Sequence, residues 1–322
     1  MTQKGRGNVH GAAVWIDRQL PEGDELFLDH VGYFVADLEA AAHHLERLGF
    51  QVSPLNVQYN ADARGDLAPT GTSNRLALLG CGFIEVLAAT GETPLADQLR
   101  SAVARYQGLH LVALAHTDMP AQRSRLIEAG FAMQDIVNLR RRVATPEGER
   151  RIAYSVLRTE RGQMAEGRVQ MLTNHTPELL WTPGSTVHEN RADALTDLLI
   201  CVGDPVEAAL RYSRFVGRPA KSADGSSVIA LDRGRLLLAG PGDASAILPD
   251  FTPPDLPYIA AIALRSADIA QTRRVLARDG IRPIVATDEL ICVGPREALG
   301  GHILFHAASV DAPWQALARA RG

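Results

Sequence analysis

Short apolar runs and amphipathic stretches alternate along the chain, and one arrangement of them recurs four times. Each copy starts with an apolar, β-rich run, passes an aspartate, continues with helical spacing and closes at or beside a glycine. The four stretches are residues 30–50, 110–131, 197–217 and 259–281. Aspartate is a favoured N-cap, and glycine is favoured after the last helical turn. The pattern therefore predicts four strand–helix units.

Two or three further strand-like runs follow each predicted helix before the next unit starts. After the first helix these include residues 74–80 and 82–89, and after the second they include 151–159 and 168–174. Each module then has the order βαβββ and a length of roughly 50–80 residues. The predicted fold class is α+β.

The chain length of 322 residues suits two domains, each with two modules and a core of its own. Residues 182–193 have turn composition without periodicity, which places the domain boundary there. Residues 1–24 are polar and contain glycine, so we expect a flexible N-terminal lead-in. The expected domains are residues 25–183 and 184–322.

Several segments carry a resemblance to a known family. They are LDHVGYFVADLEAAAHHLERLGF, GTSNRLALLG and GFIEVLAA in the first module, then NHTPELLW and HENRADALTDLLICVGDPVEAAL. Over about residues 26–307 the chain resembles the vicinal oxygen chelate superfamily, in particular its glyoxalase-like branch. This superfamily includes glyoxalase I, extradiol dioxygenases, epimerases and bleomycin-resistance proteins. The resemblance implies four βαβββ modules paired into two glyoxalase-like domains, a fold that hosts many chemistries.

The resemblance also implies metal ligands on the first and last strands of paired modules. His30 and Glu85 match these positions in the first module. Imidazole and carboxylate suit a divalent Fe, Mn, Zn, Co or Ni ion, and a carboxylate in a cleft needs such a partner. We therefore expect His30 and Glu85 to bind a metal, with Glu85 also acting in catalysis by moving a proton. The alternative is that both are ordinary polar residues on a wet sheet face.

His110 is a candidate third ligand because it opens the second module as His30 opens the first. Aligning the modules on Asp37 and Asp118 puts Leu111, and not His110, opposite His30. A one-residue bulge would restore His110, whereas regular alternation would point it away from the cleft.

On the last strand of the second module, Gln170, Asn174 and His175 compete for the place opposite Glu85. His175 also has an alternative interpretation, in which it only precedes a short helix capped by Thr176.

Asn74, Arg75 and His175 are the predicted substrate-binding residues. The related branch often has a histidine where this chain has Ser73, which removes one potential ligand. The planar guanidinium of Arg75 could orient a carboxylate or an enolate. The alternative for Arg75 is an exposed turn residue.

The two C-terminal modules contain fewer candidate ligands. Asp197 and Ala261 fall opposite His30, and His302 and His306 lack a glutamate at the matching place. We therefore expect this half to support the fold without binding metal.

Composition narrows the range of partners. The formal charge of −4 argues against a general nucleic-acid binder. A cluster of arginines indicates either a solvated hairpin or a rim that attracts an anionic substrate. Its members are Arg140, Arg141, Arg142, Arg150 and Arg151.

Three scattered cysteines, with no export signal and no membrane-length apolar run, favour a cytoplasmic protein with free thiols. The expected partner is a small-molecule substrate, with no nucleic acid and no membrane, and a homodimer is left open.

The resemblance and the candidate ligands together predict a divalent-metal-dependent enzyme of glyoxalase or dioxygenase type. It would chelate neighbouring oxygen atoms of a small oxygenated organic substrate. The sequence does not separate lyase or isomerase chemistry from extradiol-type dioxygenation. Glyoxalase-like chemistry ranks first, because oxygenation normally needs two histidines and a carboxylate on iron and only one histidine is secure. The alternative is a non-catalytic protein of the same fold that binds or sequesters a small molecule.

Overall fold

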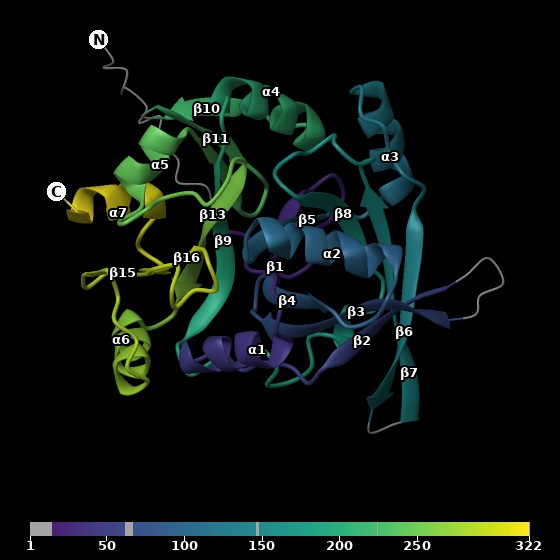
Figure 1. Ribbon diagram of the computed structural model, residues 1–322, viewed down its shortest axis with the longest axis horizontal. Coiled ribbons are helices and arrows are strands. Elements are labelled where there is room, and N and C mark those ends of the chain that lie inside the picture. The colour runs from purple at the N-terminus through teal and green to yellow at the C-terminus, as the bar shows by residue number, and fades with distance from the viewer. Residues whose placement is uncertain (1–14, 62–66, 146–147, 224, 322) are drawn as a thin grey trace, which may run out of the picture.

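The computed structural model describes residues 15–61, 67–145, 148–223 and 225–321. Seven α-helices and sixteen strands form a mixed structure in this part of the chain, which confirms the α+β class. We call residues 25–183 the N-terminal half and residues 184–322 the C-terminal half. The two halves lie side by side, and their strands belong to one continuous sheet (Figure 1).

The order strand, helix and three strands occurs twice in the N-terminal half. The elements are β1 (Phe27–Phe34), α1 (Leu38–Arg47), β2 (Asn56–Ala61), β3 (Leu67–Leu78), β4 (Phe83–Ala89), α2 (Pro94–Arg105), β5 (Gly108–Ala115), α3 (Met119–Glu128), β6 (Val137–Thr145), β7 (Gly148–Arg158), β8 (Arg168–Asn174) and the 3₁₀ turn η1 (Pro177–Leu179).

The same order occurs twice more in the C-terminal half. The elements are β9 (Ala192–Cys201), α4 (Pro205–Val216), β10 (Ala220–Ala223), β11 (Ser226–Ala230), β12 (Arg235–Ala239), α5 (Pro241–Ile247), β13 (Tyr258–Ser266), α6 (Ile269–Arg278), β14 (Val285–Ala286), β15 (Leu290–Val293), β16 (His302–Ala307) and α7 (Pro313–Arg321).

The four helices that follow the aspartates begin as the sequence predicts. Each aspartate is an N-cap whose side chain accepts backbone N–H groups of the first turn. These residues are Asp37, Asp118, Asp204 and Asp268. At the end of α4, Gly217 has a φ of 66°, a left-handed conformation that glycine adopts without strain.

Strand pairing follows one scheme in both halves. In the N-terminal half, the first strand of each module runs parallel to the last, and the two first strands, β1 and β5, pair antiparallel. The resulting strand order is β2-β3-β4-β1-β5-β8-β7-β6, and the outermost strands β2 and β6 contact each other. The C-terminal half has the order β10-β11-β12-β9-β13-β16-β15-β14. The pair of Leu109 with Ile259 joins the two halves, and isolated bridges of Phe27 with Arg233 and of Cys81 with Ala194 also connect them.

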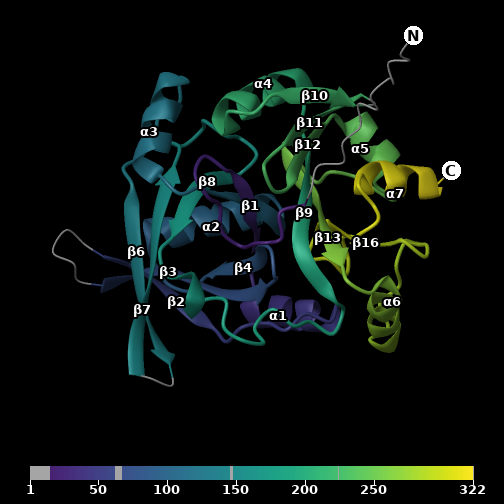
Figure 2. The same ribbon diagram turned by 180° about the vertical axis from the view of Figure 1, so that it is seen from behind.

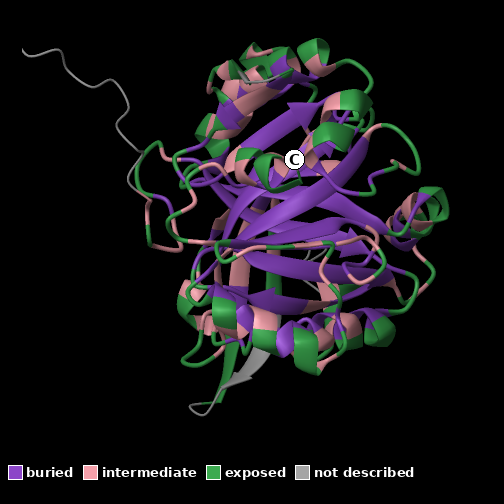
Figure 3. Cartoon of the chain, turned by 90° about the vertical axis from the view of Figure 1, so that its left-hand side faces the viewer, coloured by how far each residue is buried: buried purple, intermediate pink, exposed green. Residues whose placement is uncertain are grey.

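One apolar cluster, the shared core, runs through both halves, and smaller apolar clusters lie beside it. The shared core includes Val31 and Ile84 from the N-terminal half and Leu198 and Ile262 from the C-terminal half, all fully buried. The central strands β1, β5 and β9 are buried almost throughout, the outer strands β2, β6 and β7 are partly exposed, and the helices are buried on one side only (Figure 3). Helices α1, α3, α4 and α6 therefore cover the outside of the shared core (Figure 2).

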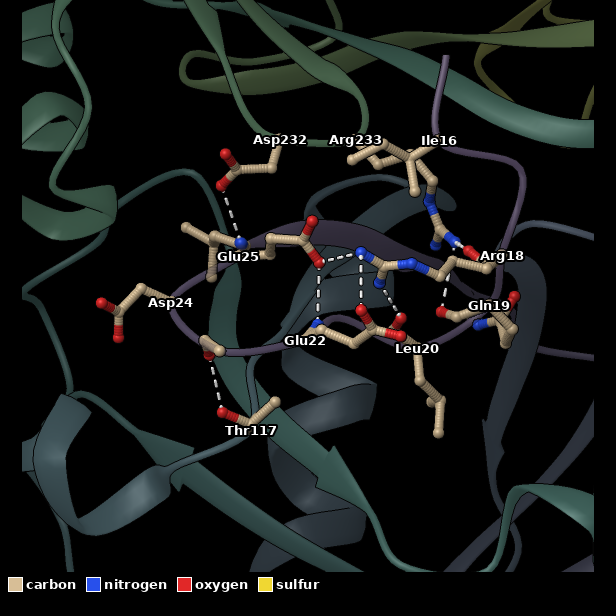
Figure 4. A network of polar contacts seen from close by, with 12 residues as sticks. Ile16, Arg18, Gln19, Leu20, Glu22, Asp24, Glu25, Thr117, Asp232 and Arg233 are labelled. Atoms are coloured by element: carbon tan, nitrogen blue, oxygen red, sulfur yellow. Dashed lines mark hydrogen bonds and ion pairs between the residues drawn. The ribbon is translucent and has the colours of Figure 1, made fainter. Parts of the chain in front are cut away.

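Residues 15–24 depart from the expected flexible lead-in, because they pack against both halves (Figure 4). The buried guanidinium of Arg233 donates to the carbonyl oxygens of Arg18 and Gln19. Thr117 donates to the carbonyl oxygen of Gly23 over 2.8 Å. Residues 1–14, which include His10, lie outside the described residues.

Residues 182–193 run as turns until β9 begins at Ala192. None of the helices in the described part of the chain combines the length and apolar character needed to cross a bilayer.

Candidate functional site

A cavity of about 150 Å³ lies inside the N-terminal half, lined by residues from all eight strands and from α2. One wall is polar and carries His30, Glu85, Asn74 and Gln170. The apolar part of the lining, which we call the apolar wall, includes Leu87, Leu95, Leu111, Leu139, Val156 and Leu172. The space suits a small molecule with a polar end and an apolar body.

His30 and Glu85 meet at the polar wall. The Nε2 atom of His30 lies 3.8 Å from the Oε2 atom of Glu85. Their strands, β1 and β4, are parallel neighbours, and Glu85 stands beside Gly32, two residues after His30. Residues two apart face the same side of a sheet, so both side chains enter the cavity. Ile84 and Val86, on either side of Glu85, are buried in the apolar core.

Asp29 fixes the orientation of the His30 ring. The Nδ1 atom of His30 lies 2.7 Å from the Oδ2 atom of Asp29. The pairing of β1 with β5 skips Asp29, and this bulge lets adjacent side chains serve one site. A carboxylate accepts from Nδ1–H, so Nε2 of the neutral ring presents its lone pair to the cavity. The ring of Phe83 stacks on His30 with centroids 4.2 Å apart.

Side-chain amides hold Glu85. Its Oε1 atom accepts hydrogen bonds from the amide groups of Asn74 and, over 3.4 Å, of Gln58. Asn56 donates to Asn74 over 2.6 Å, and Thr72 donates to Gln58 over 2.6 Å. These bonds stabilise one orientation of the carboxylate and leave Oε2 facing His30.

Gln170 occupies the place in the second module that Glu85 occupies in the first. Gln170 pairs with Ala113, just as Glu85 pairs with Gly32. The structure therefore brings Gln170 into the cavity with His30 and Glu85. The Oε1 atom of Gln170 accepts a hydrogen bond from Arg158 Nε over 3.0 Å.

His110 does not reach the cavity. The pairing of β5 with β1 does shift at His110, but Leu111 faces the cavity and His110 lines a separate one. Nε2 of His110 lies 2.8 Å from the carbonyl oxygen of Tyr106, and the two rings stack. Burial lowers the pKa of His110 to about 4. The expectation that a bulge would aim His110 at the metal site is wrong.

Two predicted substrate-binding residues also lie elsewhere. Arg75 follows Asn74 on β3, so alternation turns it to the helix side, where it binds both oxygens of Glu39 at 2.6 and 2.7 Å. His175 is exposed and lies 2.8 Å from the hydroxyl of Ser155. Of the predicted set, Asn74 is the one that lines the cavity.

Thr176 does not cap the short helix as the alternative interpretation of His175 expects. The 3₁₀ turn η1 has no side-chain cap, and the side chain of Asn174 accepts the Thr176 N–H.

The C-terminal half has no comparable site. Leu237 and Leu304 stand where Glu85 would be, and both are buried. Asp197 forms a 2.5 Å ion pair with Arg235. His302 bonds to the carbonyl oxygen of Pro249, and His306 bonds to Thr196. Within the described ranges, no group of three His, Cys, Asp or Glu side chains is placed to hold a metal.

Sequence reasoning missed several residues of the cavity. They are Asn56 and Gln58 on β2, Arg158 on β7 and Arg168 on β8. The polar alternation of Asn56, Gln58 and Asn60 is a signal that could have identified the β2 residues.

Comparison with known proteins agrees with this geometry. The family described as Glyoxalase-like domain matches residues 28–216, and the chain belongs to this family. No curated protein sequence matches the chain significantly. The fold is that of the vicinal oxygen chelate superfamily, as the sequence predicts.

Several solved structures share this fold at low sequence identity. A hypothetical protein from Staphylococcus aureus has a TM-score of 0.62 at 10% identity, covering 88% of this chain and 99% of its own. A mutant 4-hydroxymandelate synthase from Streptomyces coelicolor has a TM-score of 0.53 at 16% identity, with coverages of 92% and 99%. The Mn(II)-bound glyoxalase from Novosphingobium aromaticivorans has a TM-score of 0.51 at 11% identity, with coverages of 90% and 84%.

Proposed function

We propose that the protein is a divalent-metal-dependent enzyme of glyoxalase or dioxygenase type that acts on a small oxygenated organic substrate. The observation that carries the proposal is the approach of His30 Nε2 and Glu85 Oε2, 3.8 Å apart inside the cavity. His30, Glu85 and the amide oxygen of Gln170 would hold the ion. The names of two structural neighbours, a Mn(II)-bound glyoxalase and a 4-hydroxymandelate synthase, support this direction.

The donor atoms fit a metal chemically. Two lone-pair atoms face each other at a distance that one ion with bonds of about 2.0–2.2 Å can span. Asp29 gives His30 the carboxylate partner that metal-binding histidines usually have. A bound divalent ion would polarise the neighbouring oxygen atoms of the substrate.

The protein's own groups would do the remaining work. The amides of Asn74 and Gln58 hold Oε1 of Glu85, so Oε2 is the atom that can accept or return a substrate proton. The leucines and valine of the apolar wall pack against the body of the substrate and exclude water from it.

A non-catalytic small-molecule-binding protein is the second candidate. The observation that favours it is the bond from Arg158 to Gln170, because it engages the oxygen needed as the third metal donor. Only one histidine and one carboxylate then remain at the polar wall, too few for a tight site.

Metal analysis separates the two candidates. Protein purified without chelator should contain close to one transition metal per chain. Glu85→Gln, which keeps the shape, and His30→Ala should each remove most of it. His175→Ala is the matched control, because His175 is exposed and lies outside the cavity. Metal-free wild-type protein that stays metal-free when titrated with Mn, Fe, Co, Ni and Zn would leave the binding protein as the better proposal.

A further inference from the structure

Two arginines form the partition between neighbouring cavities. Arg158 on β7 and Arg168 on β8 line the cavity that contains His30 and Glu85, and they also line a second one of about 590 Å³. Arg158 donates to Gln170 over 3.0 Å, and Arg168 stands two residues before Gln170 on β8. Burying the charge of an arginine between two cavities costs free energy unless an opposite charge lies close to it.

Within the described ranges, neither guanidinium forms an ion pair. Among the described residues, no carboxylate oxygen lies within 4.0 Å of Arg158 or Arg168. Arg158 donates a hydrogen bond to Gln170, and the guanidinium carbon of Arg168 lies 5.4 Å from the ring centroid of Phe34. Other partly buried arginines do have carboxylates, such as Arg211 with Glu166 and Arg235 with Asp197.

Two half-buried guanidinium groups that line the same cavity lose part of their hydration and repel each other. An anion placed between the two guanidinium groups would offset this loss of hydration.

We infer that the ligand of this cavity is an oxygenated carboxylic acid whose carboxylate is bound by Arg158 and Arg168. The inference deepens the proposed function and rests on it for the identity of the binding cavity. The guanidinium groups supply planar donors, which match a carboxylate. A neighbouring oxygen of the ligand then reaches the wall of His30 and Glu85, and the apolar body packs on the leucines.

Charge balance supports an anionic ligand. The carboxylates of Asp29 and Glu85 offset the two guanidinium groups, so a divalent ion would leave the cavity positively charged. The exposed Arg140, which also lines the cavity, adds to this charge. A neutral substrate would leave this positive charge uncompensated.

Salicylate and salicylamide are suitable probes for a direct binding test. They have nearly the same size and both carry two neighbouring oxygen atoms, but only salicylate is an anion. A cavity of about 150 Å³ accommodates a benzene-sized ring. By isothermal titration calorimetry we expect salicylate to bind at least about tenfold more tightly. Equal affinities, or no salicylate binding at millimolar concentration, would overturn the inference.

Substitutions test whether the two arginines cause the preference for salicylate over salicylamide. Arg158→Gln and Arg168→Gln should each remove most of the preference for salicylate. Arg168→Lys should retain part of it, because it keeps the charge without the planar fork. Arg161→Gln is the matched control, since Arg161 is exposed and lines the second cavity alone. Equal loss in the control contradicts the assignment. Circular dichroism identifies any misfolded variant, and the remaining variants then decide.

The same titrations separate this inference from the proposed function. They are run on protein as purified and again after treatment with EDTA. A preference for salicylate in protein that never binds metal would keep the inference and refute the metal enzyme. Bound metal with equal affinity for both probes would keep the enzyme and refute the inference.

Discussion

The two halves use the same strand pairing and differ in what their sheets enclose. In the N-terminal half, β2 and β6 contact each other, and the strands surround a cavity with a carboxylate, an imidazole and three arginines. In the C-terminal half, the corresponding sheet is covered by α5 and α7 (Figure 1). Trp314 and Leu317 of α7 pack there in a cluster with Leu237 and Leu304.

The comparison shows how one fold supports either a site or a core. The position beside the first strand carries Glu85 or Gln170 in one half and Leu237 or Leu304 in the other. A polar residue there needs partners and space, whereas a leucine needs a covering helix. In the C-terminal half, the ion pair of Asp197 with Arg235 lines a cavity next to α7.

The largest expected effect comes from removing the cover of the C-terminal half. Trp314→Ala should lower the free energy of unfolding by about 3–5 kcal/mol, because the side chain is buried, and should leave bound metal unchanged. Urea denaturation and metal analysis measure the two effects. Phe83→Ala is the matched change in the N-terminal half and should reduce both quantities, since Phe83 stacks on His30. Loss of metal from folded Trp314→Ala would show that metal binding in the N-terminal half depends on packing against α7.

A smaller effect tests how the N-terminal site is supported. Asp29→Asn removes the charge behind His30 and should weaken metal affinity by about 10–100-fold, with little change in stability. Competition with a metal-sensitive dye measures the affinity. Asp232→Asn serves as the control, because Asp232 bonds to the backbone of Leu26 and not to His30. Unchanged affinity in Asp29→Asn would contradict the role given to Asp29.

The smallest expected effect lies in the histidines of the C-terminal half. His302→Ala and His306→Ala should leave the metal content unchanged, because both rings bond to other groups and no carboxylate stands at the matching place. Metal analysis of the folded variants checks this. Loss of metal in either variant would show that the candidate site has been assigned to the wrong half.

The fold was accessible from the sequence because its signals are local. The N-cap aspartates, the helix-ending glycines and the alternating apolar runs each depend on neighbours in the chain. Placing His30 and Glu85 on one face needed the family resemblance, and the structure does bring them together.

The remaining residues depend on strand register, which the sequence does not specify. The bulges at Asp29 and His110 decide which side chains enter the cavity, and the same shift that removes His110 admits Leu111. Arg158 and Arg168 lie on β7 and β8, and the pairing of these strands in the folded second module places both at the same cavity. For the same reason Arg75 looked suitable by residue type and yet faces α1.

The segment of residues 15–24 makes the halves interdependent. Gln19 donates to Asp29 over 3.2 Å, accepts from the backbone of Gly82 and is held through its own carbonyl by Arg233. Hydrogen bonds therefore connect Arg233 of the C-terminal half, through Gln19, to Asp29, the carboxylate that orients His30. For protein engineering, dividing the chain at residue 183 would remove the Arg233 contacts with this segment as well as part of the shared core. An N-terminal fragment produced alone would keep every residue of the cavity and the bond from Gln19 to Asp29, but nothing would then hold the backbone of Gln19 from the other half.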